Sequence, residues 1–332
     1  MFLDVLMRRN PRFIEAAMAL HQAGKIPANA YVLDLDAVER NARLFSKAAS
    51  ALGLKAFAMT KQVGRHSGFC AAVLRGGINR AVAVDMDCAT ACHTAGLKTG
   101  HLGHLVQVPQ RDADFAAATL KPDFWTVFSP EKAAEAARAA AKAGRVQNLL
   151  ARIQTAGDTF YRGHEGGFEA DEICAVADRL DALGGAGFAG ITTFPALLFD
   201  LESRKVRPTP NLATLARAAE ALARSGRSNI EINAPGTNST VMLDALADAG
   251  ANRAMRCMAQ RRSMRFRTCP KTRRCYTCPR FRTGMAMRPI ALAAGCILTR
   301  FSRNIRSRRL SAPRRPLAPM RWPMSKSPII RR

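Results

Sequence analysis

The chain has 332 residues, 48% of them hydrophobic, which is enough to bury one large α/β core or two ordinary ones. Its net charge of +26 is uneven, because all 25 acidic residues lie at or before Asp248 and 28 of the 51 lysines and arginines lie before Arg253. The first part is therefore only +3 (28 minus 25), and the rest is basic throughout. The sequence shows no secretory signal, no apolar run of transmembrane length and no disulfide framework. These features exclude membrane and secreted disulfide-rich classes, and we expect a soluble cytoplasmic protein with reduced thiols.

Asn10 followed by Pro11 predicts a helix over residues 11–23. Short apolar runs then alternate with alanine-rich segments of helical character. Because the runs are apolar throughout, without strict alternation, they are typical of strands that are buried on both faces of a parallel sheet. The runs lie at residues 30–35, 55–60, 80–84, 103–108, 124–128, 148–153, 188–193 and 229–233.

The repeated order of strand and helix favours an α/β fold, a (β/α)8 TIM-type barrel, over a doubly wound sheet. No G-x-G-x-x-G follows the first run, which argues against a dinucleotide site. In such a barrel the functional residues lie at the carboxyl ends of the strands. The positions that follow the runs are Lys61, Asp85, Gln107, the loop 155–168, Thr193 and the turn 234–240.

Lys61 is the first candidate, and it has two interpretations. A lysine after a strand is most often a solvated charge. At the mouth of a barrel, a lysine rooted in apolar residues is instead partly desolvated and can form a Schiff base. The turn from Asn233 to Thr240 leads into a helix with amide and hydroxyl side chains, which indicates either a phosphate site, with Ser239 as the best donor, or an ordinary N-cap. A Schiff-base lysine and a phosphate site on one face together suggest pyridoxal phosphate (PLP).

A series of motifs in chain order makes this indication more specific. They are Tyr31-Val-Leu-Asp-Leu-Asp36 with Asn41, Met59-Thr-Lys-Gln62 with Gly64-Arg65, Gly103-His-Leu-Val-Gln107 with Pro109, Gly163-His-Glu-Gly-Gly-Phe168, Thr193-Phe-Pro195, Pro208-Thr-Pro-Asn-Leu212, and Asn233-Ala-Pro235 with Ser239. Through these motifs, residues 1–252 resemble the fold-type III PLP enzymes of the alanine racemase N-terminal domain superfamily, most closely its uncharacterised YhfX-like branch.

The resemblance implies that Lys61 holds the cofactor as an aldimine and moves a proton at Cα of an amino-acid substrate. Thr193 stands where related enzymes usually carry a histidine against the cofactor ring, which implies a weaker grip on PLP. The family also implies a homodimer, in which a second domain supplies another catalytic group. The expected cofactor-binding residues are Lys61, Arg65, Gln107, Thr193, Asn238, Ser239 and Thr240.

The motifs stop near residue 253. The family continues with an eighth strand and a Glu-Pro-Gly-His type motif, whereas this chain continues with an arginine-rich sequence without acids. We therefore expect a barrel in residues 1–252 that lacks its eighth strand, followed by an irregular or disordered tail in residues 253–332. We attribute the tail to a reading-frame shift near codons 253–256. Without the eighth strand and the second domain, we expect an impaired or inactive racemase.

Two other functions remain open for the tail. Its uncompensated arginines would bind nucleic acid or other polyanions non-specifically, and the barrel would then be a non-catalytic scaffold. Cys275-Tyr-Thr-Cys278 could form a zinc site together with two of Cys257, Cys269 and Cys296, although the tail offers no matching second C-x-x-C pair.

The histidines and cysteines of the barrel receive structural interpretations. His101 and His104 flank the predicted strand at 103–108 and could line the pocket. That strand would put His104 at its start, away from the expected site, so we favour a packing role. Cys88 and Cys92 lie four residues apart on a predicted helix, and we interpret them as buried thiols, not as metal ligands.

Overall fold

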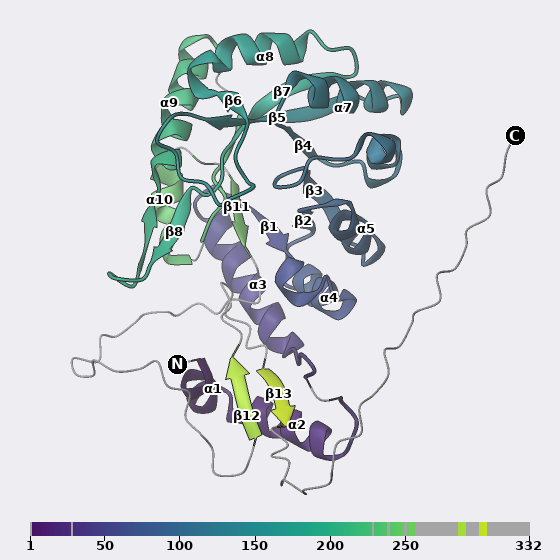
Figure 1. The fold of residues 1–332 in the computed structure, drawn as a ribbon, viewed down its shortest axis with the longest axis vertical. Coiled ribbons are helices and arrows are strands. Elements are labelled where there is room, and N and C mark those ends of the chain that lie inside the picture. Colours follow the sequence, from purple (N-terminus) through teal and green to yellow (C-terminus); the bar gives the residue numbers. More distant parts are fainter. Residues whose placement is uncertain are drawn as a thin grey trace, which may run out of the picture.

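The computed structural model describes residues 2–27, 29–227, 229–237, 240–248, 251, 253–256, 285–289 and 299–303. Within these residues, parallel strands close a ring that helices cover on the outside (Figure 1). In ring order the strands are β4 (Phe124–Val127), β3 (Lys98–Leu102), β2 (Arg80–Val82), β1 (Lys55–Met59), β11 (Arg253–Arg256), β10 (Glu231–Asn233), β7 (Ala186–Thr192) and β5 (Gln147–Gln154). Because β5 also pairs with β4, the ring is closed, and the predicted (β/α)8 architecture is confirmed.

The eighth place in the ring is taken by β11, of which the structure describes the backbone. Residues 55–58 of β1 lie in parallel register with residues 253–256, and Asn233 of β10 pairs with Arg253. The prediction of a barrel without its eighth strand is therefore wrong. A parallel ladder is made by backbone N–H and C=O groups, so the loss of the family motif does not by itself remove the strand.

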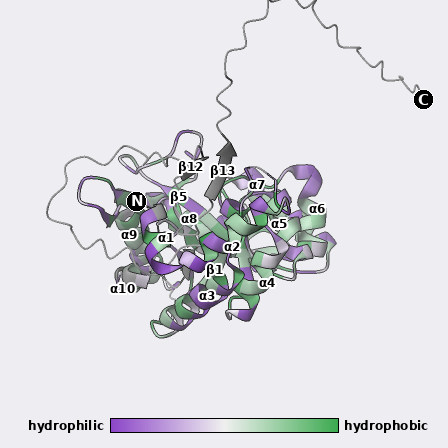
Figure 2. Ribbon diagram, turned by 90° about the horizontal axis from the view of Figure 1, so that it is seen from below, coloured by the Kyte–Doolittle hydropathy of each residue, from purple (hydrophilic) through white to green (hydrophobic). Residues whose placement is uncertain are grey.

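Helices alternate with the strands and form the outer layer. They are α3 (Leu35–Ser50), α4 (Ser67–Arg75), α5 (Met86–Thr94), α6 (Ala113–Phe115), α7 (Pro130–Lys142), α8 (Ile173–Asp181), α9 (Pro210–Arg224) and α10 (Leu243–Asp248), with the short turns η1 (Lys61–Val63), η2 (Gln110–Asp112), η3 (Ala116–Leu120), η4 (Ala170–Glu172) and η5 (Thr240–Met242). Hydrophobic and hydrophilic residues alternate along these helices in Figure 2. None of the described helices has the length and apolarity that crossing a membrane requires.

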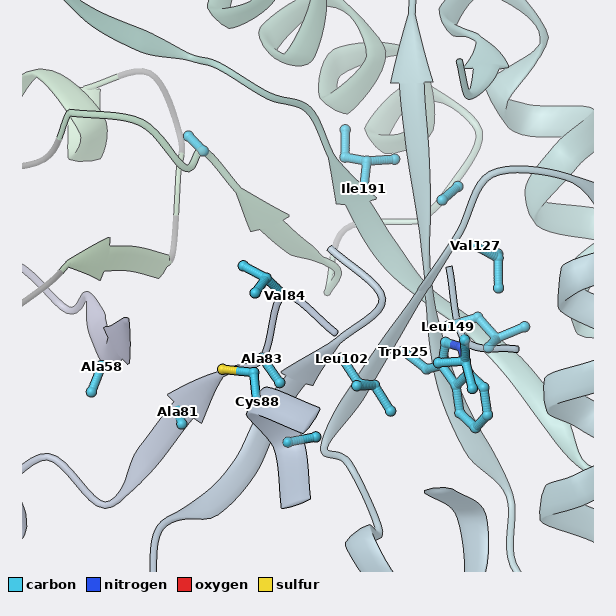
Figure 3. Close-up of a cluster of buried hydrophobic side chains, with 14 of the residues drawn as sticks. Ala58, Ala81, Ala83, Val84, Cys88, Leu102, Trp125, Val127, Leu149 and Ile191 are labelled. Carbon is cyan, nitrogen blue, oxygen red and sulfur yellow. The ribbon is translucent and has the colours of Figure 1, made fainter. Parts of the chain in front are cut away.

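The apolar core lies mainly between the ring and the helices. Figure 3 shows Leu102, Val127 and Leu149 in this layer, and each is fully or almost fully buried. Inside the ring, Phe57 and Val82 form a separate small cluster. The strands are thus buried on both faces, which explains why their sequences read as continuous apolar runs.

Two predicted strands are misplaced. Residues 31–34 are not a strand but lead into α3, where the Asp34 carboxylate accepts a hydrogen bond from the N–H of Ala37 at 2.8 Å. The predicted strand at 103–108 is the connection after β3, which itself spans Lys98–Leu102. A strand whose residues include Thr99 and His101 does not read as an apolar run, which is why the pattern missed it.

The remaining elements lie outside the ring. Helices α1 (Phe2–Arg9) and α2 (Pro11–Gln22) pack against each other before the barrel, and α2 confirms the predicted first helix. Strand β6 (Phe168–Glu169) pairs in parallel with the last two residues of β5. Strands β8 (Leu197–Asp200) and β9 (Lys205–Pro208) form an antiparallel hairpin in the second long loop. In the predicted irregular tail, residues 253–256 form β11, and β12 (Met285–Pro289) and β13 (Thr299–Arg303) are paired with each other. The remaining tail residues lie outside the described part, including both cysteines of the suggested zinc motif.

Candidate functional site

Lys61 lies at the rim of the barrel, immediately beyond the carboxyl end of β1. The preceding residue, Thr60, is buried, and its hydroxyl lies 3.2 Å from the Cys92 sulfur on α5, which ties the end of the strand to the helix layer. The Lys61 side chain is exposed at this rim. Its charge is close enough to His104 to contribute to lowering the pKa of that imidazole. The amine is thus placed where the barrel fold puts functional groups.

Arg65 follows on the same connection, where Gly64 and Arg65 both have positive φ angles, of 63° and 58°. Its guanidinium forms an ion pair with Asp85 at 3.0 Å. Asp85 in turn accepts a hydrogen bond from the N–H of Cys88 at 2.7 Å and caps α5. Arg65 therefore joins two strand ends of the rim through Asp85, and its contact with a cofactor stays a prediction.

A polar group spans the inside of the barrel. The Asn233 side-chain amide donates to Nδ1 of His101 at 3.2 Å and to the hydroxyl of Thr192 at 3.1 Å. Nε2 of His101 is hydrogen-bonded to the hydroxyl of Thr126. These residues come from β3, β4, β7 and β10, so their bonds cross the interior of the ring. Both ring nitrogens of His101 are engaged, which supports the predicted structural role for that residue.

Arg152 lies inside the barrel and is only 1% exposed. Its Nη2 donates to the carbonyl groups of His164 and Phe194, and its guanidinium carbon lies 4.7 Å from the centre of the Phe128 ring. Nε and Nη1 have no hydrogen-bond partner, and no carboxylate among the described residues is bonded to the group. Burial lowers the pKa of Arg152 to about 10, so the side chain remains a cation at neutral pH. A buried, incompletely bonded cation favours the binding of an anion.

His104 lies just beyond the carboxyl end of β3, because that strand ends at Leu102. The side chain is 1% exposed, and its ring centre lies 5.2 Å from that of His101 and 5.3 Å from that of Phe194. Neither ring nitrogen has a hydrogen-bond partner. Burial, helped by the charges of neighbouring basic groups, lowers its pKa well below the usual value. Its interpretation as a packing residue at the start of a strand rested on the wrong strand position.

Aromatic side chains form a wall beside Arg152 and His104. Phe194 is central, with ring centres of Tyr161 at 5.7 Å and of His164 at 6.0 Å. Thr193 is buried, and its hydroxyl accepts a hydrogen bond from the Asn211 amide on α9 at 3.3 Å. The aromatic surface at this strand end is therefore supplied by the residue that follows the predicted Thr193.

Gln107 connects two neighbouring segments of the rim through hydrogen bonds to backbone groups. Its side-chain amide donates to the carbonyl oxygens of Gly103 at 3.0 Å and Thr126 at 3.2 Å, and accepts from the N–H of Phe128 at 3.2 Å. These bonds join the connection after β3 to the end of β4. A direct contact between Gln107 and a cofactor stays a prediction.

The predicted phosphate turn is described in part, because Asn238 and Ser239 lie outside the described residues. Thr240 is half-buried and opens η5. The preceding backbone is held against β8, since the N–H of Thr237 donates to the carbonyl of Leu197 at 2.9 Å. A Cβ on Gly236 would come within 2.6 Å of the Leu197 backbone, so glycine permits this close approach.

The topology therefore gathers the described candidates on one rim. Lys61 and Arg65 follow β1, Gln107 follows β3, Thr193 follows β7 and Thr240 follows β10. To these the structure adds an incompletely bonded cation, Arg152, an imidazole without hydrogen-bond partners, His104, and an aromatic wall. An amine that can form a Schiff base, on the same rim as a cation and a flat aromatic surface, suits a planar anionic carbonyl compound such as PLP. The residues present thus fit the cofactor that the motifs indicate.

Sequence reasoning missed Arg152 and Phe194, and it misjudged His104. A signal for Arg152 was available, because an arginine inside the run 148–153 is unusual for a strand buried on both faces. The position of His104 at the rim could be predicted only from the correct end of β3, and the apolar pattern placed that strand too late in the sequence. Phe194 lies in the motif Thr193-Phe-Pro195, but the motif was interpreted only through Thr193.

Comparison with known proteins agrees with this geometry. Residues 33–254 match the family described as alanine racemase, N-terminal domain. The chain is 39% identical over 255 residues to the uncharacterized protein YhfX of Escherichia coli (strain K12), across 76% of this chain and 65% of YhfX. The chain therefore spans slightly less than two thirds of the length of this relative.

Two solved structures share the fold. The lysine/ornithine decarboxylase of Vibrio vulnificus, solved with putrescine, has a TM-score of 0.55 at 12% identity, over 75% of this chain and 67% of the decarboxylase. SrLDC, solved in complex with PLP and cadaverine, has a TM-score of 0.53 at 15% identity, over 71% of this chain and 62% of SrLDC. Identities this low bear on the fold alone. The family match, however, extends through seven strands of the ring and into the eighth, and the chain belongs to the alanine racemase N-terminal domain family.

Proposed function

We propose that this chain is a cytoplasmic, homodimeric PLP-dependent enzyme that removes and returns the Cα proton of an amino acid, as a racemase does. The observation that carries the proposal is Arg152, a buried cation whose Nε and Nη1 have no partner, in a family barrel whose rim also bears Lys61. PLP carries a phosphate and an ionisable ring oxygen, and such groups satisfy unpartnered guanidinium N–H groups. When bound, PLP accepts the electron pair that is left at Cα.

Each rim residue then has a role of its own. Lys61 supplies the amine that holds the cofactor covalently and also moves a proton at Cα. Arg152 stabilises anionic oxygen atoms of the cofactor or substrate, and Phe194 offers the flat surface for the ring that Thr193 lacks. Asn238, Ser239 and Thr240 remain the proposed phosphate-binding residues.

The proposal includes activity, although the sequence alone led us to expect an impaired enzyme. That expectation had two grounds, the absence of the eighth strand and of the family's second domain. The first ground is removed, because β11 occupies the eighth place. Chiral analysis after incubation with a panel of single-enantiomer amino acids would detect racemisation, whereas release of carbon dioxide would indicate decarboxylation instead.

The direct test is covalent trapping. PLP is added to the full chain, the visible absorbance is recorded, and borohydride reduction is followed by peptide mapping. We expect one reduced adduct, on Lys61. Adducts spread over surface lysines such as Lys55, which is 67% exposed in its side chain, would refute the proposal.

The tail carries a separate proposal. The family match ends at residue 254, beside the last acidic residue at Asp248, and we propose that a frame shift near codons 253–256 separates the barrel of residues 1–252 from the tail. Translation of the neighbouring frames should restore a Glu-Pro-Gly-like motif, and its absence from every frame would refute the shift. Polyanion binding by the tail concerns residues that mostly lie outside the described part, and salt-dependent retention on arbitrary DNA would test it.

A further inference from the structure

His104 differs from every other histidine of the described barrel. His101 is bonded through both nitrogens, the His66 ring accepts from the N–H of Gly68, and His93 is exposed on α5. His164 is half-buried at the aromatic wall. His104 alone combines almost complete burial with two ring nitrogens that lack a partner.

Such an arrangement has a free-energy cost. A buried polar group without a hydrogen bond destabilises the fold by roughly 1–3 kcal/mol, and most buried polar groups in proteins are bonded. His104 also lies at the functional rim, next to Phe194 and under the electrostatic influence of Arg152 and Lys61. An imidazole left unbonded in this position is available to a ligand.

We propose that His104 is a second proton-transfer residue, which acts together with Lys61 at Cα of the amino-acid substrate. This inference rests on the proposed function and extends it. Racemisation needs an acid or base on each side of Cα, and we had expected this chain to lack one of them. Lys61 and His104 follow different strands, β1 and β3, so the two groups occupy separate positions on the rim of the ring.

The proton balance is complete within the site. In one direction the Cα–H bond would break and its proton would go to an unprotonated nitrogen of His104, while a bound PLP would supply the electron sink for the pair left at Cα. Lys61, in its protonated form, would then give a proton to Cα, and that electron pair would form the new C–H bond. The low pKa of His104 keeps its ring unprotonated at neutral pH, as a base requires. Exchange with water restores both groups, so no other reactant is needed.

A binding experiment tests the position of His104 without turnover. The full chain is labelled with 15N-histidine, and the stable conjugate N-(5'-phosphopyridoxyl)-L-alanine is added. We expect the ring nitrogen signals of His104, assigned by their loss in His104→Asn, to shift on binding, and those of the exposed His93 to remain unchanged. Saturated binding without a shift of the His104 signals would overturn the inference.

A kinetic experiment tests its role. Exchange of the Cα proton is measured in D2O with the amino-acid panel, for the wild type, His104→Asn, His104→Gln and the control His93→Asn. We expect both His104 variants to keep the trapped adduct on Lys61 and to lose about 100-fold or more in kcat, within the usual range for an acid–base group. The His93 variant should match the wild type.

The outcomes separate the two proposals. If the wild type gives no adduct on Lys61, the proposed function fails. If the adduct forms but the His104 variants exchange at the wild-type rate, or no amino acid exchanges, the inference on His104 fails and cofactor binding stands. Loss of the adduct in both His104 variants would show a binding role and would also overturn the inference.

Discussion

The outer layer and the mouth of the barrel are built in opposite ways. In the outer layer, Phe45, Leu149 and Ile153 are apolar, fully buried and packed in one continuous core between the strands and helices. At the mouth, Arg152 and His104 are equally buried, yet four of their nitrogen atoms have no partner. The comparison teaches that stability is concentrated outside the ring, while the mouth holds groups whose partners must come from a ligand.

The largest effect should follow from changing Lys61. Lys61→Ala removes the amine that forms the covalent bond, so we expect no single trapped adduct after borohydride reduction. The free energy of unfolding, measured by urea titration, should stay within about 0.5 kcal/mol of the wild type, because the side chain is exposed. Lys55→Ala, at the start of the strand that precedes Lys61, is the matched control and should keep the adduct. A single adduct that persists at another lysine would mean that this other lysine holds the cofactor.

A change in the outer layer should have the reverse effect. Phe45 on α3 is fully buried, and Phe45→Ala leaves a cavity that should lower the free energy of unfolding by about 3–5 kcal/mol. Urea titration measures the loss. At temperatures where the variant remains folded, it should still form the Lys61 adduct. A cost below about 1 kcal/mol would mean that the helix layer is less tightly packed than the structure shows.

Arg152 offers the sharpest contrast between the two regions. Arg152→Met keeps much of the side-chain volume but removes a buried charge to which no carboxylate of the described residues is hydrogen-bonded. We expect the free energy of unfolding without ligand to be unchanged or higher by about 1 kcal/mol, because the cost of burying the charge disappears. PLP affinity, measured by absorbance titration, should fall about 10-fold or more, since roughly 1.5–3 kcal/mol is typical of a charged hydrogen bond. A variant that is less stable than the wild type but binds PLP with unchanged affinity would mean that Arg152 stabilises the fold and does not bind the cofactor.

The same contrast explains what the sequence could predict. Runs such as 124–128 and 148–153 are apolar because the strands are buried on both faces, so the barrel could be predicted from pattern alone. β3 was placed too late because two buried polar residues, Thr99 and His101, interrupt its apolar character, and the side chain of His101 is bonded inside the ring. The pattern therefore failed where polar residues enter the barrel.

The site shows a similar division. Lys61 could be found because it follows a clear strand and lies in a motif, and the structure places it at the rim. The bonds of Gln107 to three backbone groups, and the missing partners of Arg152 and His104, depend on contacts between strands that are distant in sequence. The eighth strand was missed for another reason. Backbone pairing between β1 and β11 leaves little trace in the side chains of residues 253–256.

The smallest expected effect concerns pH. In an unfolded chain, His104 takes up a proton as the pH falls through about 6.5. In the folded chain, burial lowers the pKa of His104, and the nearby basic groups of His101, Arg152, Lys61 and His164 lower it further. The unfolded state then binds more protons, so the free energy of unfolding should fall by up to about 1.4 kcal/mol per pH unit below that point. The contribution ends only below the depressed folded pKa. His104→Asn removes this contribution, and urea titrations between pH 8 and pH 5 should show a shallower decline in the variant than in the wild type. Equal slopes would mean that the folded imidazole takes up its proton as readily as the unfolded one, and that the mouth is better solvated than its unbonded nitrogens indicate.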